Sequence, residues 1–163
     1  MKIVDTQNYN EIEESIVKFI QQANAIDIDL KTKNIGTKDY PKTYMGYNIK
    51  ISFGKGSPAK VPWLAFLKGN NKIIKGIYPI ILYFKREEEL ILSFGISYYL
   101  EPMNSWKLGK EFKTIEAYFE EKKYEKSKYG KSLVYKVYKV KNIDIKNLSK
   151  DINSILKIYD LHI

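Results

Sequence analysis

Short apolar runs separated by glycine, proline and lysine fill the middle of this chain, and they constrain its fold more than any other feature. The runs cover Tyr47 to Phe53, Val61 to Leu67, Tyr78 to Phe84 and Leu90 to Ile96. Runs of this length, bounded by turn residues, are typical of β-strands. Because proline cannot donate to a sheet ladder, we expect the strands that contain Pro62 and Pro79 to begin at those residues.

Amphipathic segments flank this region on both sides. Apolar residues recur at helical spacing in residues 11–25 and again in residues 145–159, and a shorter helix is predicted over residues 114–121 with Thr114 as its N-cap. A fifth strand is predicted over residues 133–140. The pattern predicts an α+β fold, in which a central twisted sheet of about five strands, mixed or antiparallel, carries helices at the N-terminus, in the middle and at the C-terminus.

The chain has the length and composition of one domain. Its 163 residues are 44% hydrophobic, enough for a substantial core, and no repeat or low-complexity linker divides them. We therefore treat residues 1–163 as a single domain.

A basic charge balance favours a polyanionic partner. The chain has 28 Lys and Arg against 19 Asp and Glu, which gives a formal charge of +9. Only Arg86 is an arginine, so lysine-rich composition explains this excess as readily as function does. The 14 tyrosines favour nucleic acid, because aromatic rings interleaved with lysine serve base stacking and phosphate contact together.

The absence of cysteine and the scarcity of histidine argue against several kinds of enzyme. Cysteine is absent, which excludes disulfides, thiolate zinc sites and a cysteine nucleophile, and which suits a reducing cytoplasm. The single histidine, His162, is one residue from the end of the sequence, a poor place for a general base. No signal peptide and no stretch of about 20 apolar residues is present. We expect a non-catalytic cytoplasmic protein without cofactor, metal or membrane contact.

Three polar motifs have weak links to chemistry. Gly-Lys-Ser at residues 130–132 resembles the end of a phosphate-binding loop, but Glu125 stands where that loop needs glycine, so we reject a nucleotide site. The acidic run at residues 87–89 is predicted to be a solvated hairpin turn. Glu-Glu-Lys at residues 120–122 resembles part of a metal-dependent nuclease signature, and such a nuclease is the enzyme hypothesis that remains.

Positive signals for DNA contact come from the loops. Residues 54–60, Gly-Lys-Gly-Ser-Pro-Ala-Lys, combine backbone freedom at Gly56 with phosphate-binding side chains at Lys55 and Lys60. A second basic loop contains Lys126, Lys128, Tyr129, Gly130 and Lys131. On pattern alone this second loop is equally well explained as a charged surface turn.

Aromatic residues at the strand starts are candidates for a binding cleft. Trp63 follows Pro62, and Tyr78 opens the next run, which also contains Leu82. Large aromatic residues at such positions serve a core as well as a stacking platform. We expect Trp63, Tyr78 and Leu82 to line one cleft.

An ordered set of motifs resembles the N-terminal DNA-binding domain of the McrB family of modification-dependent restriction proteins. The motifs are KDYP at 38–41, Tyr44, SFGKG at 52–56, PW-AFL at 62–67, GIYP at 76–79, the LYFK and ELIL strands, GIS followed by Glu101 and Pro102, and KYGKS at 128–132. The resemblance runs from about residue 11 to the end.

The resemblance implies a reader of modified DNA. In that family the domain flips methylated cytosine into an aromatic pocket, while a GTPase region of the same chain and a McrC-like nuclease subunit perform translocation and cleavage. By position, Trp63, Tyr78, Leu82 and Tyr129 match the pocket, and the segment around Lys55 matches a finger loop that distorts the duplex. Lysine replaces an aromatic residue there, which puts the wedge role in doubt.

The expected function is therefore recognition of a modified base, 5-methylcytosine first, in double-stranded DNA, with phage defence as its setting. Trp63, Tyr78, Leu82 and Tyr129 are the expected pocket, and the expected backbone contacts are Lys55, Gly56, Lys60, Lys128 and Lys131. One alternative keeps the fold and reads an unmodified sequence or another modified base. The alternatives from other classes are the metal-dependent nuclease and a protein-interaction module.

Overall fold

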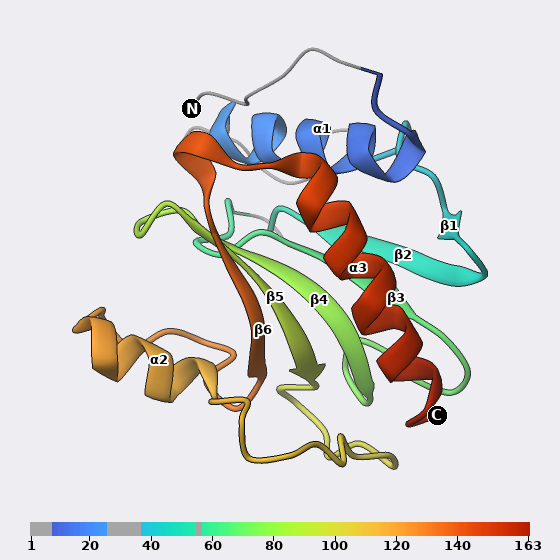
Figure 1. Cartoon of the computed structure of the whole chain (residues 1–163), viewed down its shortest axis with the longest axis vertical. Helices are drawn as coiled ribbons and strands as arrows, with labels where there is room; N and C mark the ends of the chain where they lie inside the picture. Colours follow the sequence, from blue (N-terminus) through green and yellow to red (C-terminus); the bar gives the residue numbers. More distant parts are fainter. Residues whose placement is uncertain (1–7, 26–36, 55–56) are drawn as a thin grey trace.

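The computed structural model describes residues 8–25, 37–54 and 57–163. These residues form a six-stranded sheet, in the order β1-β2-β3-β4-β5-β6, and three α-helices (Figure 1). The elements are α1 Glu11–Ala25, β1 Thr43–Tyr44, β2 Tyr47–Ser52, β3 Trp63–Leu67, β4 Ile77–Phe84, β5 Glu89–Ile96, α2 Ile115–Lys122, β6 Leu133–Lys139, a 3-10 helix Val140–Asn142 and α3 Ile145–Asp160. The predicted α+β class is confirmed.

Every strand pairs with its neighbour in sequence, so the sheet is an antiparallel meander. Such pairing needs no crossover, and turns join β1 to β2 and β4 to β5 directly. The expectation of a mixed or antiparallel sheet is thus resolved in favour of the antiparallel one. The sixth strand is β1, whose two residues are too few to carry a recognisable pattern.

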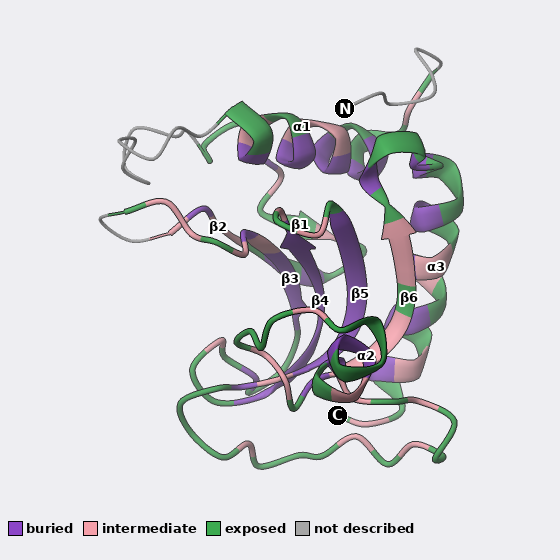
Figure 2. Ribbon diagram, turned by 90° about the vertical axis from the view of Figure 1, so that its left-hand side faces the viewer, coloured by how far each residue is buried: buried purple, intermediate pink, exposed green. Residues whose placement is uncertain are grey.

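Helices cover the two faces of the sheet unequally. Figure 1 shows α1 and α3 packed together, with α2 apart from them. The Tyr83 hydroxyl of β4 lies 2.5 Å from Asn24 Oδ1 of α1, whereas Phe84, the next residue, stacks edge-on against Phe119 of α2 at 4.8 Å between ring centroids. Because neighbouring strand residues face opposite sides, α1 and α2 lie on opposite faces. Every residue of β4 is therefore buried (Figure 2).

Side-chain caps begin the helices. Asn10 and Glu13 form a reciprocal capping box at α1, in which each side-chain oxygen accepts from the other residue's backbone N–H at 2.9 Å. Thr114 Oγ1 accepts from the Ala117 N–H at 3.1 Å, which confirms Thr114 as the N-cap of α2. Asp144 caps α3 in the same way through the Asn147 N–H.

The predicted start of one strand was wrong. Strand β4 begins at Ile77, so Pro79 is its third residue. Tyr83 donates its N–H towards β3, to the Pro62 carbonyl, and Pro79 is four residues away and so faces the same edge. The β3–β4 pairing ends at Ile80, so no carbonyl of β3 lies opposite Pro79. The N–H group that proline lacks is therefore not needed at this position. β3 begins at Trp63, directly after Pro62.

The acidic run at residues 87–89 was predicted to be a solvated hairpin turn, and this prediction was wrong for Glu89. Glu89 is the first residue of β5 and is only 1% exposed. Its carboxylate accepts from the Tyr118 hydroxyl at 2.7 Å and the Tyr124 hydroxyl at 3.0 Å, and it pairs with Lys139. Burial would raise the pKa of Glu89, but these donors outweigh it and hold the pKa below its ordinary value of 4.5.

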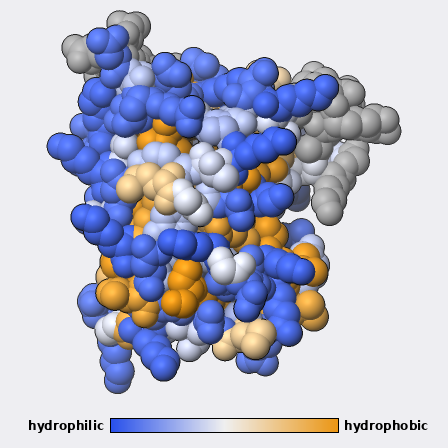
Figure 3. All heavy atoms as spheres, turned by 90° about the vertical axis from the view of Figure 1, so that its right-hand side faces the viewer, coloured by the Kyte–Doolittle hydropathy of each residue, from blue (hydrophilic) through white to orange (hydrophobic). Residues whose placement is uncertain are grey.

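On the side shown in Figure 3, hydrophilic side chains surround patches of hydrophobic ones. In the described part of the chain, no helix is long and apolar enough to cross a membrane.

Candidate nucleic-acid interface

Three of the predicted pocket residues lie on the face of the sheet that α2 covers. Trp63, the first residue of β3, pairs directly with Leu82 of β4. Tyr78, Leu82 and Phe84 lie at even spacings along β4 and so share one face of the strand, and Phe84 contacts Phe119 of α2. Their side chains therefore face α2 and not α1.

Tyr129 reaches these residues from a loop more than forty residues further along the chain. Burial raises the pKa of the Tyr129 hydroxyl, the nearby Tyr99 raises it further, and a hydrogen bond from the Trp63 side chain opposes them. Burial raises the pKa of the Tyr78 hydroxyl, and electrostatic interaction with Tyr129 raises it further. Trp63 and Tyr78 therefore lie on one face of the sheet, and Tyr129 interacts with both from its loop.

The four residues differ in how accessible they are. Leu82 is fully buried and Tyr78 is 5% exposed, whereas Trp63 and Tyr129 are half-buried. The Tyr78 hydroxyl donates to the Ile73 carbonyl at 2.8 Å, which fixes its ring. In this conformation Tyr78 and Leu82 form a floor, and the two half-buried aromatic residues are the ones that a ligand meets first.

A glycine provides the space for the Tyr78 ring. Gly95 is the residue of β5 directly opposite Tyr78. A Cβ at this position would come within 2.5 Å of the Tyr78 carbonyl oxygen and 3.1 Å of its Cδ1 atom. Any larger residue would therefore displace the floor of the cluster.

The Tyr129 loop is attached to the start of α2. The carbonyls of Ser132 and Gly130 accept from the Ile115 and Glu116 N–H groups at 2.8 and 3.1 Å, which satisfies the first free amides of the helix. Tyr129 itself has φ of 70°, in the left-handed region that non-glycine residues seldom adopt. Such a conformation persists where the surroundings enforce it, and it is common at binding sites.

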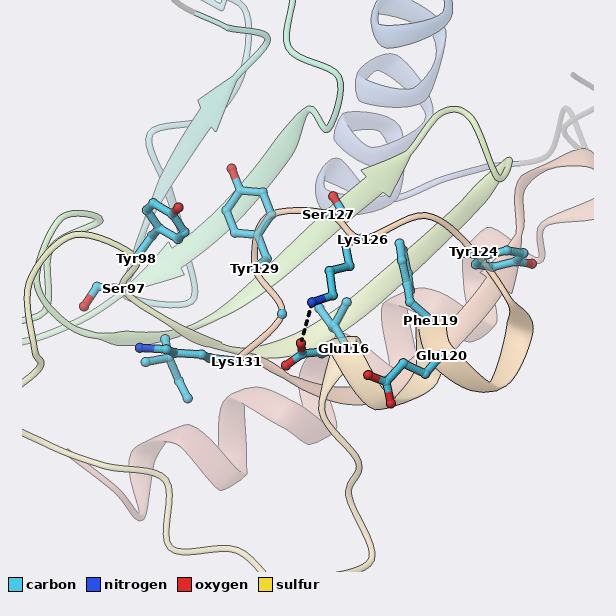
Figure 4. Close-up of a pocket in the computed structure, with 13 residues that line it drawn as sticks. Ser97, Tyr98, Glu116, Phe119, Glu120, Tyr124, Lys126, Ser127, Tyr129 and Lys131 are labelled. Carbon is cyan, nitrogen blue, oxygen red and sulfur yellow. Dashed lines mark ion pairs between the residues drawn. The ribbon is translucent and has the colours of Figure 1, made fainter.

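A pocket of about 460 Å³ opens beside this cluster, between α2, the end of β5 and the Tyr129 loop. Figure 4 shows Tyr98 and Tyr129 at one end and Phe119 and Tyr124 at the other. Trp63, Tyr78 and Leu82 do not line this pocket; of the four predicted residues only Tyr129 does.

Sequence reasoning missed most of this lining. Phe119 lies in the helix predicted over residues 114–121 and was not expected to line a site, and neither Tyr98 nor Tyr124 was among the expected site residues. The Tyr98-Tyr99 pair directly after an apolar strand was the available signal. Glu116 and Glu120 also line the pocket, so its mouth carries both signs of charge.

The predicted phosphate-binding lysines are at the surface. Lys60, Lys128 and Lys131 are exposed, and among the described residues none of the three forms an ion pair. Lys131 lines the pocket, whereas Lys60 precedes β3 on a different loop. Lys55 and Gly56 lie outside the described residues.

Comparison with known proteins identifies the family. The family described as MrcB-like, N-terminal domain matches residues 6–127, about three quarters of the sequence. The chain belongs to the MrcB-like N-terminal domain family. This confirms the resemblance drawn from the motifs and the expectation that the chain is not itself an enzyme. Trp63, Tyr78 and Leu82 lie inside the matched range, and Tyr129 lies two residues beyond it.

A curated relative is the Type IV methyl-directed restriction enzyme EcoKMcrB subunit of Escherichia coli strain K12. It is 42% identical over 106 residues, which are 64% of this chain and 22% of the relative. The match thus spans about a fifth of the relative's length.

Proposed function

We propose that this chain is the DNA-binding domain of a restriction system, and that it recognises a modified base, 5-methylcytosine first, by flipping that base out of the duplex into an aromatic site. The observation that carries this proposal is the convergence of Trp63, Tyr78 and Tyr129 on the face of the sheet that holds Leu82, beside Lys128 and Lys131, which form no ion pair among the described residues. Family membership and the methyl-directed relative support it. Trp63, Tyr78, Leu82 and Tyr129 are the proposed pocket.

The energetics of base flipping suit this cluster. Extruding a base costs a few kcal/mol, and stacking on an aromatic ring returns roughly 1–3 kcal/mol per base. Trp63 and Tyr129 interact directly in the unbound chain, so a base that enters between them must separate them. Once there, the base would rest on Tyr78 and Leu82.

The buried aliphatic side chain of Leu82 would favour a methyl group on the bound base. Burying one methyl group stabilises a complex by on the order of 1 kcal/mol, about a fivefold preference. Leu82 is the aliphatic residue paired with Trp63 on the neighbouring strand, and it is fully buried. The remaining discrimination must come from hydrogen bonds to the base edge.

In this proposal the chain directs cleavage but does not perform it. A GTPase region in the same protein and a McrC-like nuclease subunit are the proposed partners, because the relative is much longer than the matched domain. No cofactor is proposed for the domain itself.

Binding to a panel of duplexes tests the proposal. The duplexes are identical except for one position, which carries cytosine, 5-methylcytosine, 5-hydroxymethylcytosine, 4-methylcytosine or, in an adenine context, N6-methyladenine. Tightest binding to one modified duplex is the expected result, and it names the base. Equal binding to all of them at fixed salt would contradict modified-base recognition and favour the alternative of an unmodified sequence.

The nuclease alternative has its own test. Glu120 is exposed, and among the described residues no group of three or more His, Cys, Asp or Glu side chains could hold a metal ion. Magnesium-dependent nicking of plasmid that disappears in Glu120→Gln would establish this alternative against the binding-only proposal.

Salt dependence is expected to distinguish backbone lysines from pocket residues. Each phosphate contact contributes about 0.9 to the slope of log K against log salt, so Lys128→Gln or Lys131→Gln should lower that slope by about 0.9. Both changes should weaken modified and unmodified duplexes alike. Lys157→Gln, an exposed lysine of α3, is the matched control and should leave the slope unchanged. A flat salt response of the unsubstituted chain would favour a protein-interaction module.

A further inference from the structure

Two adjacent tyrosines next to the pocket are unusually exposed. Tyr98 is 62% and Tyr99 is 71% exposed, directly after the end of β5. Their rings meet edge-on with centroids 5.3 Å apart. Tyrosine usually buries its ring and leaves its hydroxyl in water. A pair that leaves most of both rings accessible is therefore suited to a ligand that covers them.

The tyrosine pair adjoins the proposed base pocket. Tyr98 and Tyr129 line the same 460 Å³ pocket, and Figure 4 shows them at the same end of it. Tyr99 is close enough to Tyr129 to raise the pKa of its hydroxyl. On the other side, Tyr98 and Tyr99 line a second hollow of about 610 Å³. Tyr98 thus lines both hollows, and Tyr129 lines the first of them.

Hydrogen bonds hold this segment in place. The Ser97 N–H donates to the Gly76 carbonyl at 2.9 Å, and the Leu100 N–H donates to the Ile74 carbonyl at 3.1 Å. The Trp106 indole donates to the Gly95 carbonyl at 2.9 Å. The two tyrosines are consequently presented on a segment that is anchored before and after them, so little ordering entropy remains to be lost on binding.

We propose that Tyr98 and Tyr99 form a second stacking site, which binds an unstacked base next to the base held in the aromatic pocket. This inference rests on the proposed function. Flipping one base leaves its neighbours without a stacking partner on one side, and an exposed aromatic ring is a sequence-tolerant replacement.

The accessible rings and one unpaired lysine favour a nucleic acid strand over a protein as the occupant. Lys131 lines both hollows and forms no ion pair among the described residues. Lys126 of the first hollow pairs with Glu116, and Glu120 and Glu101 also line the hollows, so Lys131 is the cation available to a phosphate. Neither tyrosine forms a hydrogen bond through its hydroxyl within the described structure, which leaves both groups for phosphate or base edges. The site also continues the proposed DNA interface without a break.

A double-mutant cycle between ring and base tests the second stacking site. Tyr98→Ala and Tyr99→Ala are measured on the best modified duplex and on the same duplex with an abasic site next to the modified base. On the intact duplex each substitution should weaken binding by about 5- to 150-fold. On the abasic duplex the substitutions should weaken binding little further, because the base that would stack on the tyrosines is already absent.

Two control variants identify the source of the effect. Tyr98→Phe and Tyr99→Phe keep the rings and should retain most of the affinity. Met103→Ala alters an 81% exposed apolar residue of the same segment and should have no effect. A loss in Met103→Ala as large as in Tyr98→Ala would overturn the assignment to the tyrosine pair.

The outcomes separate this inference from the proposed function. If the unsubstituted chain prefers a modified duplex while Tyr98→Ala and Tyr99→Ala bind like it, the second site is refuted and the base pocket stands. The second site is also refuted if each tyrosine substitution weakens binding to the abasic duplex as much as it weakens binding to the intact duplex. If the unsubstituted chain binds no DNA, both proposals fail.

Discussion

Tyr129→Ala is expected to weaken binding to the preferred modified duplex by roughly 5- to 150-fold, the range that 1–3 kcal/mol of lost stacking corresponds to. The preference over the unmodified duplex should largely disappear as well. Tyr129 is half-buried and lies in a loop, so its ring can be removed without opening the core beneath Tyr78 and Leu82. Fluorescence anisotropy titration with the matched duplexes measures both effects.

Two substitutions separate stacking from general damage in this test. Tyr129→Phe keeps the ring and should retain most of the affinity, losing only the interaction with Trp63. Tyr135→Ala removes another half-buried tyrosine, one that packs against Phe94 and Phe112 away from the pocket. Its DNA affinity should stay unchanged even if it melts earlier. Unaltered discrimination in a folded Tyr129→Ala variant would remove Tyr129 from the pocket.

Glu89→Leu is expected to lower the free energy of unfolding by about 1–3 kcal/mol, the cost of leaving buried hydroxyl groups without a hydrogen-bond acceptor. The change leaves the Tyr118 and Tyr124 hydroxyls without their acceptor and Lys139 without its partner. Tyr118 belongs to α2, so the helix that lines the pocket should loosen first. Urea denaturation followed by circular dichroism measures the change.

A neighbouring pair supplies the control for Glu89. Glu88 forms an exposed ion pair with Lys141 at 3.1 Å, and Glu88→Gln should change stability by less than about 1 kcal/mol. Equal effects of Glu88→Gln and Glu89→Leu would contradict a special role for the buried carboxylate.

The pH dependence of stability follows from the same group. The folded-state pKa of Glu89 is below its ordinary value of 4.5, so the folded state binds the proton less readily than the unfolded chain. The stabilisation is therefore complete above about pH 4.5 and is lost as the pH falls through the folded pKa. Glu13, whose pKa is also lowered, adds to this loss. Glu89→Gln should show a shallower acid transition.

Local patterns determined the order of the elements. Helical spacing placed α1 and α3, and Thr114 was recognised as a cap, because these signals depend only on residues a few positions apart. The ends of the strands were less certain. Pro79 lies inside β4 because the neighbouring strand has already ended, a fact of pairing and not of the local sequence.

The candidate site was predicted only in part, and for a different reason. Trp63, Tyr78 and Leu82 were placed together because they open or follow consecutive strands, and antiparallel neighbours meet in space. Tyr129 joined them through the family resemblance, not through spacing. Tyr98, Phe119 and Tyr124 were missed as pocket residues, because an aromatic residue has the same pattern whether it fills a core or lines a hollow.

The sequence by itself determined the α+β class, the helices, the aromatic and basic composition, and the family. Only the tertiary structure decided that Glu89 is buried, that Tyr129 accepts a hydrogen bond from Trp63 and that Tyr98 and Tyr99 remain exposed. Periodicity reports which face of an element is apolar, and that information is local. Burial of a charge depends on donors from distant segments, here Tyr118, 29 residues away, and Lys139, 50 residues away, which meet Glu89 only after the sheet and α2 have packed.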